Sequence, residues 1–159
     1  PVVCRLEGYT LGAGLEIAAA CDLRIAADNA FFGMPEVKVG VPSVVEAALL
    51  PRLIGWGRTS WMVLTAENID AATGERWGMV EKVVPAAKLG DAVKHCVDNI
   101  VEGTPKSVRA QKRLMRRWER LPLDEAVQAG IDAFAESVGE GEHIERMTAF
   151  VNRKKKGAS

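Results

Sequence analysis

Short apolar segments separated by compact turns dominate residues 1–84. Segment 2–7 is rich in β-branched residues, and 22–27, 30–33 and 80–84 are further short, largely apolar segments, which predicts strands at all four. Between the first two lies Leu15 to Cys21, which is apolar on nearly all sides and predicts a short buried helix. A strand–helix–strand series of this length implies parallel pairing, so we expect an α/β architecture.

Helical patterns follow. Ser43 precedes Glu46 by three residues, the spacing of a capping box, and predicts one helix over 44–54. Further helices are expected over 58–66 and, after an Asp70 cap, through Trp77. Beyond residue 85 four apolar stripes at helical spacing predict helical hairpins, and Thr104 with Pro105 marks the start of the second. We therefore expect an α/β part over 1–84, a helical part over 85–153 and a tail over 154–159.

Composition narrows the function classes. The 21 basic and 21 acidic residues cancel, so no overall field favours nucleic acid. No apolar run reaches the roughly 20 residues of a membrane span. Cys4, Cys21 and Cys96 are odd in number and have no metal-ligand spacing, which favours reduced, buried thiols in a cytoplasmic protein without a bound metal. Because the chain opens with Pro1 directly into an apolar strand, we interpret it as part of a longer protein.

Candidate chemistry gathers between Gly12 and Glu36. Gly12, Ala13 and Gly14 form a small-residue turn before a helix, whose free backbone N–H groups could stabilise an oxyanion. Glu16 and Glu36 are 20 residues apart, enough for a helix, a strand and a return loop. Two carboxylates can hold a water and move protons, and beside such a turn they suit chemistry next to a thioester carbonyl.

A structural interpretation competes with this one. Glutamate is favourable in the first turn of any helix, so spacing alone favours a capping role for both Glu16 and Glu36. The glycine turn does not match the dinucleotide fingerprint, because the next required glycine position is Ile17.

A resemblance to a known family favours the catalytic interpretation of Glu16 and Glu36 over the capping one. The sequence resembles the crotonase (enoyl-CoA hydratase/isomerase) superfamily along nearly the whole chain. The matching segments are residues 1–40, LPRLIGWGRT, LTAENIDAATGERWGMVEKVVP, VRAQKRL and AFVNRKKKG. The resemblance implies a ββα superhelix, here only its C-terminal portion, followed by a helical region used in trimer assembly. It also implies an acyl-CoA substrate, no separate cofactor, and a homotrimer or a dimer of trimers. Neither membrane nor nucleic-acid binding is expected.

Residue roles carry over by position. Ala13, with Gly14 beside it, matches the second oxyanion-hole amide, Glu16 the carboxylate that activates water, and Glu36 the one that exchanges a proton with C2. The implied reaction is the reversible hydration of a 2-enoyl-CoA, a lyase activity of fatty-acid metabolism. Because many members lack one glutamate, keeping both favours a hydratase. Another crotonase chemistry, an isomerase or a specialised acyl-CoA hydratase, is the first alternative. A non-catalytic fragment that binds partner subunits or an anionic polymer is the alternative from another class.

The chain also departs from the family pattern. Ala13 replaces a glycine, and Pro42-Ser43-Val44-Val45-Glu46 replaces P-G-A-G-G, so the acyl pocket must differ. Glu46 is expected to cap a helix or contact substrate, and Met34 to fill the core or line the acyl pocket. Gly12 and Pro35 complete the expected substrate-binding set. The first oxyanion-hole amide and much of the CoA surface should lie in upstream sequence, so the chain alone is expected to be inactive.

Other polar and aromatic features favour structural roles. The basic run from Lys106 to Arg120 fits a solvated helix face, with attraction of CoA phosphates as the alternative. His95 and His143 have no nucleophile motif around them, and the four tryptophans suit core or subunit contacts.

Overall fold

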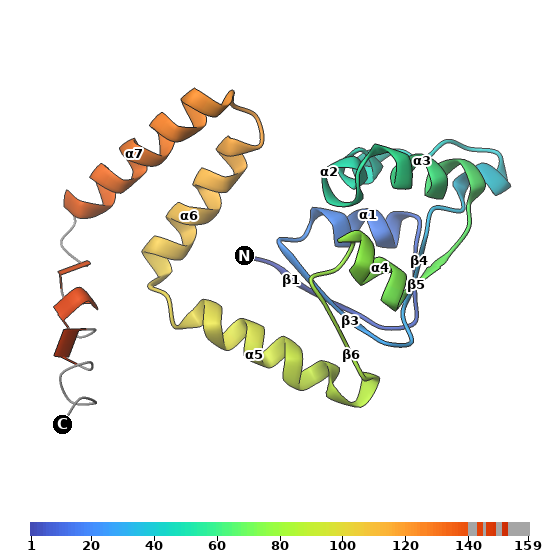
Figure 1. The fold of residues 1–159 in the computed structure, drawn as a ribbon, viewed down its shortest axis with the longest axis horizontal. Coiled ribbons are helices and arrows are strands. Elements are labelled where there is room, and N and C mark those ends of the chain that lie inside the picture. Colours follow the sequence, from blue (N-terminus) through green and yellow to red (C-terminus); the bar gives the residue numbers. More distant parts are fainter. Residues whose placement is uncertain (140–142, 145, 149–150, 153–159) are drawn as a thin grey trace. The chain divides into compact units, whose positions relative to one another are not determined.

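The structure, a computed structural model, describes residues 1–139, 143–144, 146–148 and 151–152. The chain forms two compact units, Pro1–Glu102 and Gly103–Ser159 (Figure 1). The first contains β1 (Val3–Leu6), β2 (Tyr9–Leu11), α1 (Ala13–Ala20), β3 (Leu23–Ala27), β4 (Phe31–Gly33), η1 (Glu36–Val39), η2 (Val45–Leu49), α2 (Leu50–Ile54), α3 (Trp56–Thr65), β5 (Ile69–Asp70), α4 (Ala71–Trp77), β6 (Lys82–Val84), η3 (Ala86–Lys88) and α5 (Leu89–Val101). The second contains α6 (Pro105–Trp118) and α7 (Leu123–Gly139).

Two small sheets frame the first unit. One has the order β1-β3-β6 with both pairs parallel, which confirms the parallel pairing predicted from the strand–helix–strand pattern. The other has the order β2-β4-β5. In it β4 pairs parallel with β2 and antiparallel with β5. The sequence predicted a turn where β2 lies and no strand at β5. Strands of three and two residues are too short to produce a periodic signal, and their hydrogen-bond partners lie far away in the chain.

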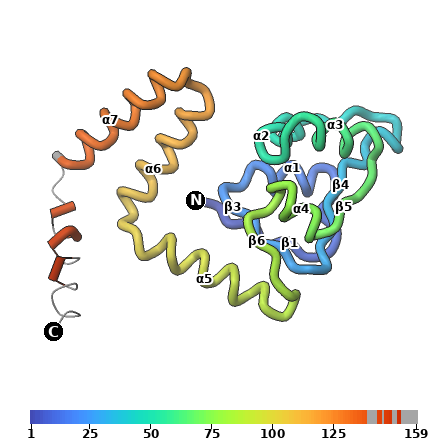
Figure 2. Tube along the Cα trace, viewed as in Figure 1, coloured from blue at the N-terminus to red at the C-terminus, as the bar shows by residue number. Residues whose placement is uncertain are grey.

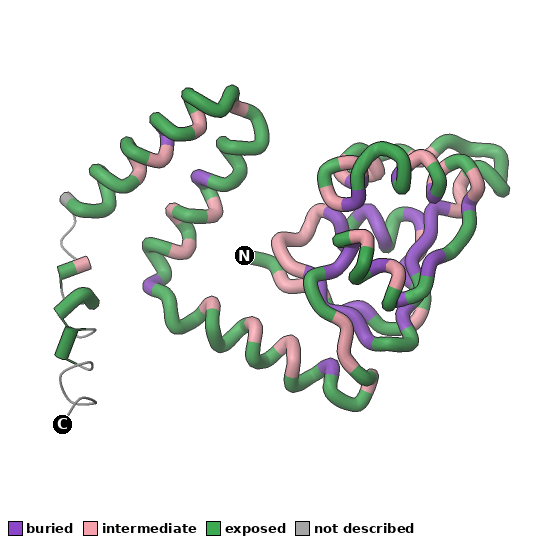
Figure 3. The backbone as a smooth tube through the Cα atoms, viewed as in Figure 1, coloured by how far each residue is buried: buried purple, intermediate pink, exposed green. Residues whose placement is uncertain are grey.

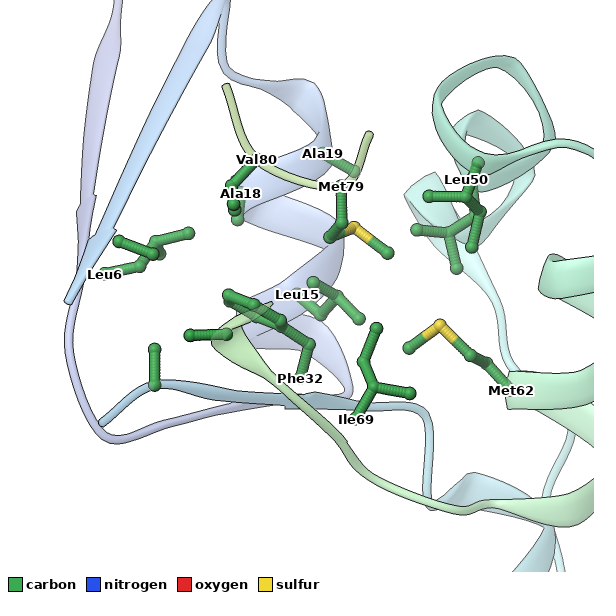
Figure 4. Packing of buried hydrophobic residues seen from close by; sticks show 14 of the residues in the cluster. Leu6, Leu15, Ala18, Ala19, Phe32, Leu50, Met62, Ile69, Met79 and Val80 are labelled. Atoms are coloured by element: carbon green, nitrogen blue, oxygen red, sulfur yellow. The ribbon is translucent and has the colours of Figure 1, made fainter. Parts of the chain in front are cut away.

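Helix α1 lies at the centre of the core. Leu15 and Ala18 are fully buried, and around them pack Phe32 of β4, Met79 after α4, and Leu50 and Met62 from α2 and α3 (Figure 4). The buried positions of Figure 3 concentrate on α1 and the neighbouring strands. The sequence predicted burial on nearly all sides, but only one face of α1 is buried, and Ile17 on the other face is 66% exposed.

Helix α5 packs within the first unit. Its first residue, Leu89, is fully buried with Ile25 and Ala27 of β3. Figure 2 lets the reader follow the chain from β6 through η3 into this helix. The helical part expected over 85–153 therefore begins with a helix that covers strands of the α/β unit, whereas the functional division into core and trimerisation region stays a prediction.

The second unit is a hairpin of α6 and α7. Thr104 caps α6 by accepting a hydrogen bond from the Ser107 amide at 3.2 Å, and Pro105 occupies the first turn, both as predicted. Trp118 Nε1 donates to the Ala126 carbonyl at 3.0 Å and ties the two helices together. The fourth predicted helix, over 144–151, lies only in part within the described residues, and the tail over 154–159 lies outside them.

The prediction of one helix over 44–54, capped by Ser43, is wrong. The chain forms the 3-10 helix η2 and then α2; Val44 stands at the N-cap of η2 without a side-chain hydrogen bond. Pro51 explains the break, because proline lacks an N–H and suits the first turn of a new helix. Among the helices of the described residues, none is long and apolar enough to cross a membrane.

Candidate active site

Parallel pairing of β2 with β4 builds the candidate site. Leu11 lies opposite Gly33, and the Gly12 amide donates to the Gly33 carbonyl at 2.9 Å. β2 continues into α1 at Gly12, and β4 continues through Met34 and Pro35 into η1 at Glu36. Because parallel strands end at the same edge of a sheet, the N-terminus of α1 and the turn that carries Glu36 come to the same edge.

Gly12 forms the turn that starts α1. Its φ of 53° and ψ of −127° lie where only glycine is comfortable, and its carbonyl accepts the Leu15 amide at 2.8 Å and the Glu16 amide at 3.0 Å. Ala13 and Gly14 are the first two residues of the helix and are exposed. Their amides precede the first intrahelical hydrogen bond, so they are placed to bind an anion. The positive φ falls on Gly12, which explains why alanine is accommodated at position 13.

The Glu36 carboxylate lies against this turn. A Cβ placed on Gly12 would be 2.6 Å from Glu36 Oε1, so the carboxylate occupies the space that glycine leaves open. The other oxygen, Oε2, accepts a hydrogen bond from Ser43 Oγ at 3.2 Å. η1 begins at Glu36, as predicted, and the half-buried carboxylate reaches the positive end of the α1 dipole.

Glu16 lies in the first turn of the same helix, as predicted, and is 4% exposed. No residue in the described part of the chain forms a hydrogen bond or ion pair with its carboxylate. Glu16 lies one turn into the helix that starts at Gly12. Its role in proton transfer stays a prediction.

The structure places the remaining predicted site residues in different settings. Met34 is fully buried in the core cluster, and Pro35 is the half-buried N-cap of η1. Glu46 is exposed in η2, a segment that packs against α1. Their contact with substrate stays a prediction.

Two contacts of the Glu36 turn were missed from the sequence. Ser43 donates to Glu36, and Lys38 Nζ donates to the Ala66 carbonyl at 2.8 Å, which ties η1 to the end of α3. The only sequence signal was the polar Ser43 where the resembled family has glycine. Nothing along the chain marks Lys38, since its partner is a backbone group 28 residues away.

The cysteines, His95 and the basic run on α6 lie outside the candidate site. Burial raises the pKa of the Cys4 thiol to about 11, and the nearby Cys21 adds to the effect. The three cysteines are free and half-buried, and no cluster of three His, Cys, Asp or Glu within the described residues could hold a metal ion. His95 lies within 3.3 Å of the Asn99 amide on the exposed face of α5, and the residues of the basic run on α6 are mostly exposed.

The chain is similar in sequence and structure to known proteins. The family model described as enoyl-CoA hydratase/isomerase matches residues 1–157. The chain belongs to the enoyl-CoA hydratase/isomerase family, and its mixed α/β fold is the crotonase fold.

Individual relatives agree. A short-chain-enoyl-CoA hydratase of Clostridium acetobutylicum is 36% identical over 98% of this chain and 60% of its own length. A crotonyl-CoA hydratase of Syntrophomonas wolfei shows the same identity and coverage. The chain thus spans about 60% of the curated relatives it matches.

Solved structures give the same picture. An enoyl-CoA hydratase from Bacillus anthracis superposes with a TM-score of 0.88 at 30% identity over 92% of this chain and 57% of the other. A protein from Thermobifida fusca YX, whose structure contains acetoacetyl-CoA, superposes with a TM-score of 0.82 at 31% identity over 87% of this chain and 55% of the other.

Proposed function

We propose that this chain provides the two catalytic glutamates and one oxyanion-hole amide of an enoyl-CoA hydratase. The observation that carries the proposal is the meeting of Glu36 with the glycine turn at the start of the helix that bears Glu16. The names of the relatives support a 2-enoyl-CoA as substrate, and the acetoacetyl-CoA in one related structure supports an acyl-CoA thioester in general.

In the proposed mechanism the Ala13 amide, with Gly14 next to it, donates to the thioester oxygen as negative charge develops there. Fixed donors of this kind need no reorganisation during the reaction, and the loss of one costs about 3 kcal/mol in other enzymes. Glu16 activates a water for attack at C3, and Glu36 exchanges a proton with C2. The product is a 3-hydroxyacyl-CoA, and the reverse reaction uses the same groups.

The proposal extends to the cofactor, the cellular location and the oligomeric state. The reaction needs no cofactor besides the CoA of its substrate. Free thiols at Cys4, Cys21 and Cys96 support a cytoplasmic location. The apolar side chains exposed on α7, Leu123, Val127, Ile131, Phe134 and Val138, support assembly into a trimer or a dimer of trimers through this unit.

The test follows the absorbance of the conjugated enoyl thioester of crotonyl-CoA and of longer 2-enoyl-CoA thioesters. We expect loss of this absorbance with the complete gene product and little or none with residues 1–159 alone. An unchanged absorbance across chain lengths with the complete gene product would overturn the hydratase proposal.

A further inference from the structure

Ser43 lies in the segment that joins η1 to η2, half-buried and seven residues after Glu36. Its hydroxyl does not cap η2, since Val44 occupies the N-cap and no side chain bonds there. The hydrogen bond of that hydroxyl goes to Glu36 Oε2 at 3.2 Å.

The two oxygens of Glu36 are located by different parts of the fold. Oε1 lies over Gly12, at the end of β2, and Oε2 accepts from Ser43, which follows η1 in the chain. The terminal torsion of a glutamate has a broad, shallow preference, so the carboxylate plane turns freely unless contacts hold it. With one oxygen against the turn and the other bonded to Ser43, the plane is held at both ends.

The backbone around Ser43 is itself held. The Val41 amide donates to the Glu36 carbonyl at 3.2 Å, and η2 packs against α1 with Leu50 fully buried at its end. Val45, the first residue of η2, has a φ of 53°, a conformation that is unfavourable for a β-branched residue. The segment that carries Ser43 is therefore held at one end by the Val41 hydrogen bond and at the other by η2.

We propose that Ser43 is a positioning residue for Glu36, whose hydroxyl holds the carboxylate in the orientation for proton exchange at C2. This inference rests on the proposed function. The hydrogen bond from the Ser43 hydroxyl holds Oε2, while Oε1 stays over the Gly12 turn. Loss of that bond leaves Oε2 to water and frees the carboxylate plane. Small misplacement of a reacting group lowers the rate of the chemical step more than it changes substrate binding.

The test compares Ser43→Ala, Ser43→Thr and the matched control Ser60→Ala, a half-buried serine of α3, in the complete gene product with crotonyl-CoA. We expect Ser43→Ala to lower kcat up to about 10-fold with KM changed less than about twofold, as for the loss of one hydrogen bond. Ser43→Thr, which keeps the hydroxyl, should recover most of the rate, and Ser60→Ala should match the wild type.

A double-mutant cycle separates positioning from a structural role. In the Glu36→Gln background, Ser43→Ala should have no further effect on kcat, because the group it orients is already lost. A full tenfold loss in that background, or wild-type kcat in the Ser43→Ala protein, would overturn the inference. If Ser43→Ala fails to fold, Ser43→Thr at wild-type kcat supports the inference, and a folded Ser43→Cys protein that keeps full kcat with its weak donor contradicts it. Absence of hydration by the wild-type gene product instead overturns the proposed function, and this inference with it.

Discussion

The Glu36 carboxylate lies so close to Gly12 that no larger residue fits there: a Cβ on Gly12 would lie 2.6 Å from the Oε1 atom of Glu36. Glycine is therefore required at this position for two reasons, the backbone angles of the turn and the carboxylate that rests on it. The two residues are 24 positions apart in the chain, and the parallel pair β2–β4 brings them together.

Gly12→Ala should damage both the fold and the reaction. The unfavourable backbone should lower the free energy of unfolding by about 1–3 kcal/mol, and displacement of Glu36 should lower kcat/KM about 100-fold. Chemical denaturation and the crotonyl-CoA assay measure the two effects. The control is Gly90→Ala in α5, where a Cβ meets nothing within 4 Å; it should raise stability by roughly 0.5–1 kcal/mol and leave the rate unchanged. Full activity in Gly12→Ala would show that the contact is not required.

Glu16→Gln and Glu36→Gln should each lower kcat by about 10²–10⁴-fold, since both remove a proton-transfer group while keeping its shape. Glu102→Gln, at the exposed C-cap of α5, serves as the control and should keep the wild-type rate. Exchange of the C2 proton of a saturated acyl-CoA with deuterated solvent, followed by NMR, tests Glu36 separately. A Glu36→Gln protein with full exchange would assign that step to another group.

Arg24 is expected to be critical for stability. It is 4% exposed, pairs with Glu81, and its guanidinium donates to the carbonyls of Met79, Ala18 and Cys21, at 3.0, 3.3 and 2.8 Å. Arg24→Met would remove the guanidinium hydrogen bonds to these carbonyls and the pair with Glu81, and should cost about 2–3 kcal/mol. The control Arg5→Met removes an exposed pair with Glu7 and should cost no more than about 1 kcal/mol. Equal melting temperatures for the two variants would contradict the assignment.

Substitution of Val45 should stabilise the protein. It is 77% exposed with a φ of 53°, so its branched side chain contributes strain and little burial. Val45→Asn, which tolerates this conformation, should raise the free energy of unfolding by about 1 kcal/mol. Val44→Asn is the matched control: this neighbour is extended, with φ of −128°, so the same change should give no gain. Thermal unfolding of both variants distinguishes strain relief from a general preference for asparagine.

Asp70 should make stability depend on pH. Its carboxylate caps α4 by accepting the Thr73 amide at 2.8 Å, and this hydrogen bond holds the pKa of Asp70 below its ordinary value. Because the pKa is lower in the folded protein, the stabilisation is present above the unfolded value of about 4 and is lost as pH falls through the folded one. Asp70→Ala should therefore cost about 1 kcal/mol at pH 7 and less at pH 3. Asp70→Asn keeps a capping oxygen without titrating and should show no such pH dependence.

Local patterns in the sequence were enough for the elements and for the candidate residues. The apolar segment after Gly14 predicted the buried helix α1, Asp70 and Thr104 predicted caps that the structure contains, and the resemblance gave the family. These features depend on neighbours within a few positions, or on motifs read directly from residue order. The capping role predicted for Ser43 was wrong because its hydroxyl has a competing partner seven residues away in the folded chain.

Only the tertiary structure decided how the candidate residues meet. On spacing alone a capping role was favoured for both Glu16 and Glu36. The burial of Glu16, and the contacts of Glu36 with Gly12 and Ser43, follow from pairing between β2 and β4 and from packing of η2 on α1. Strands of three residues have no periodic signature, and side-chain contacts across 24 positions depend on the whole core. The residues of the site are therefore local information, whereas its geometry is a property of the packed fold.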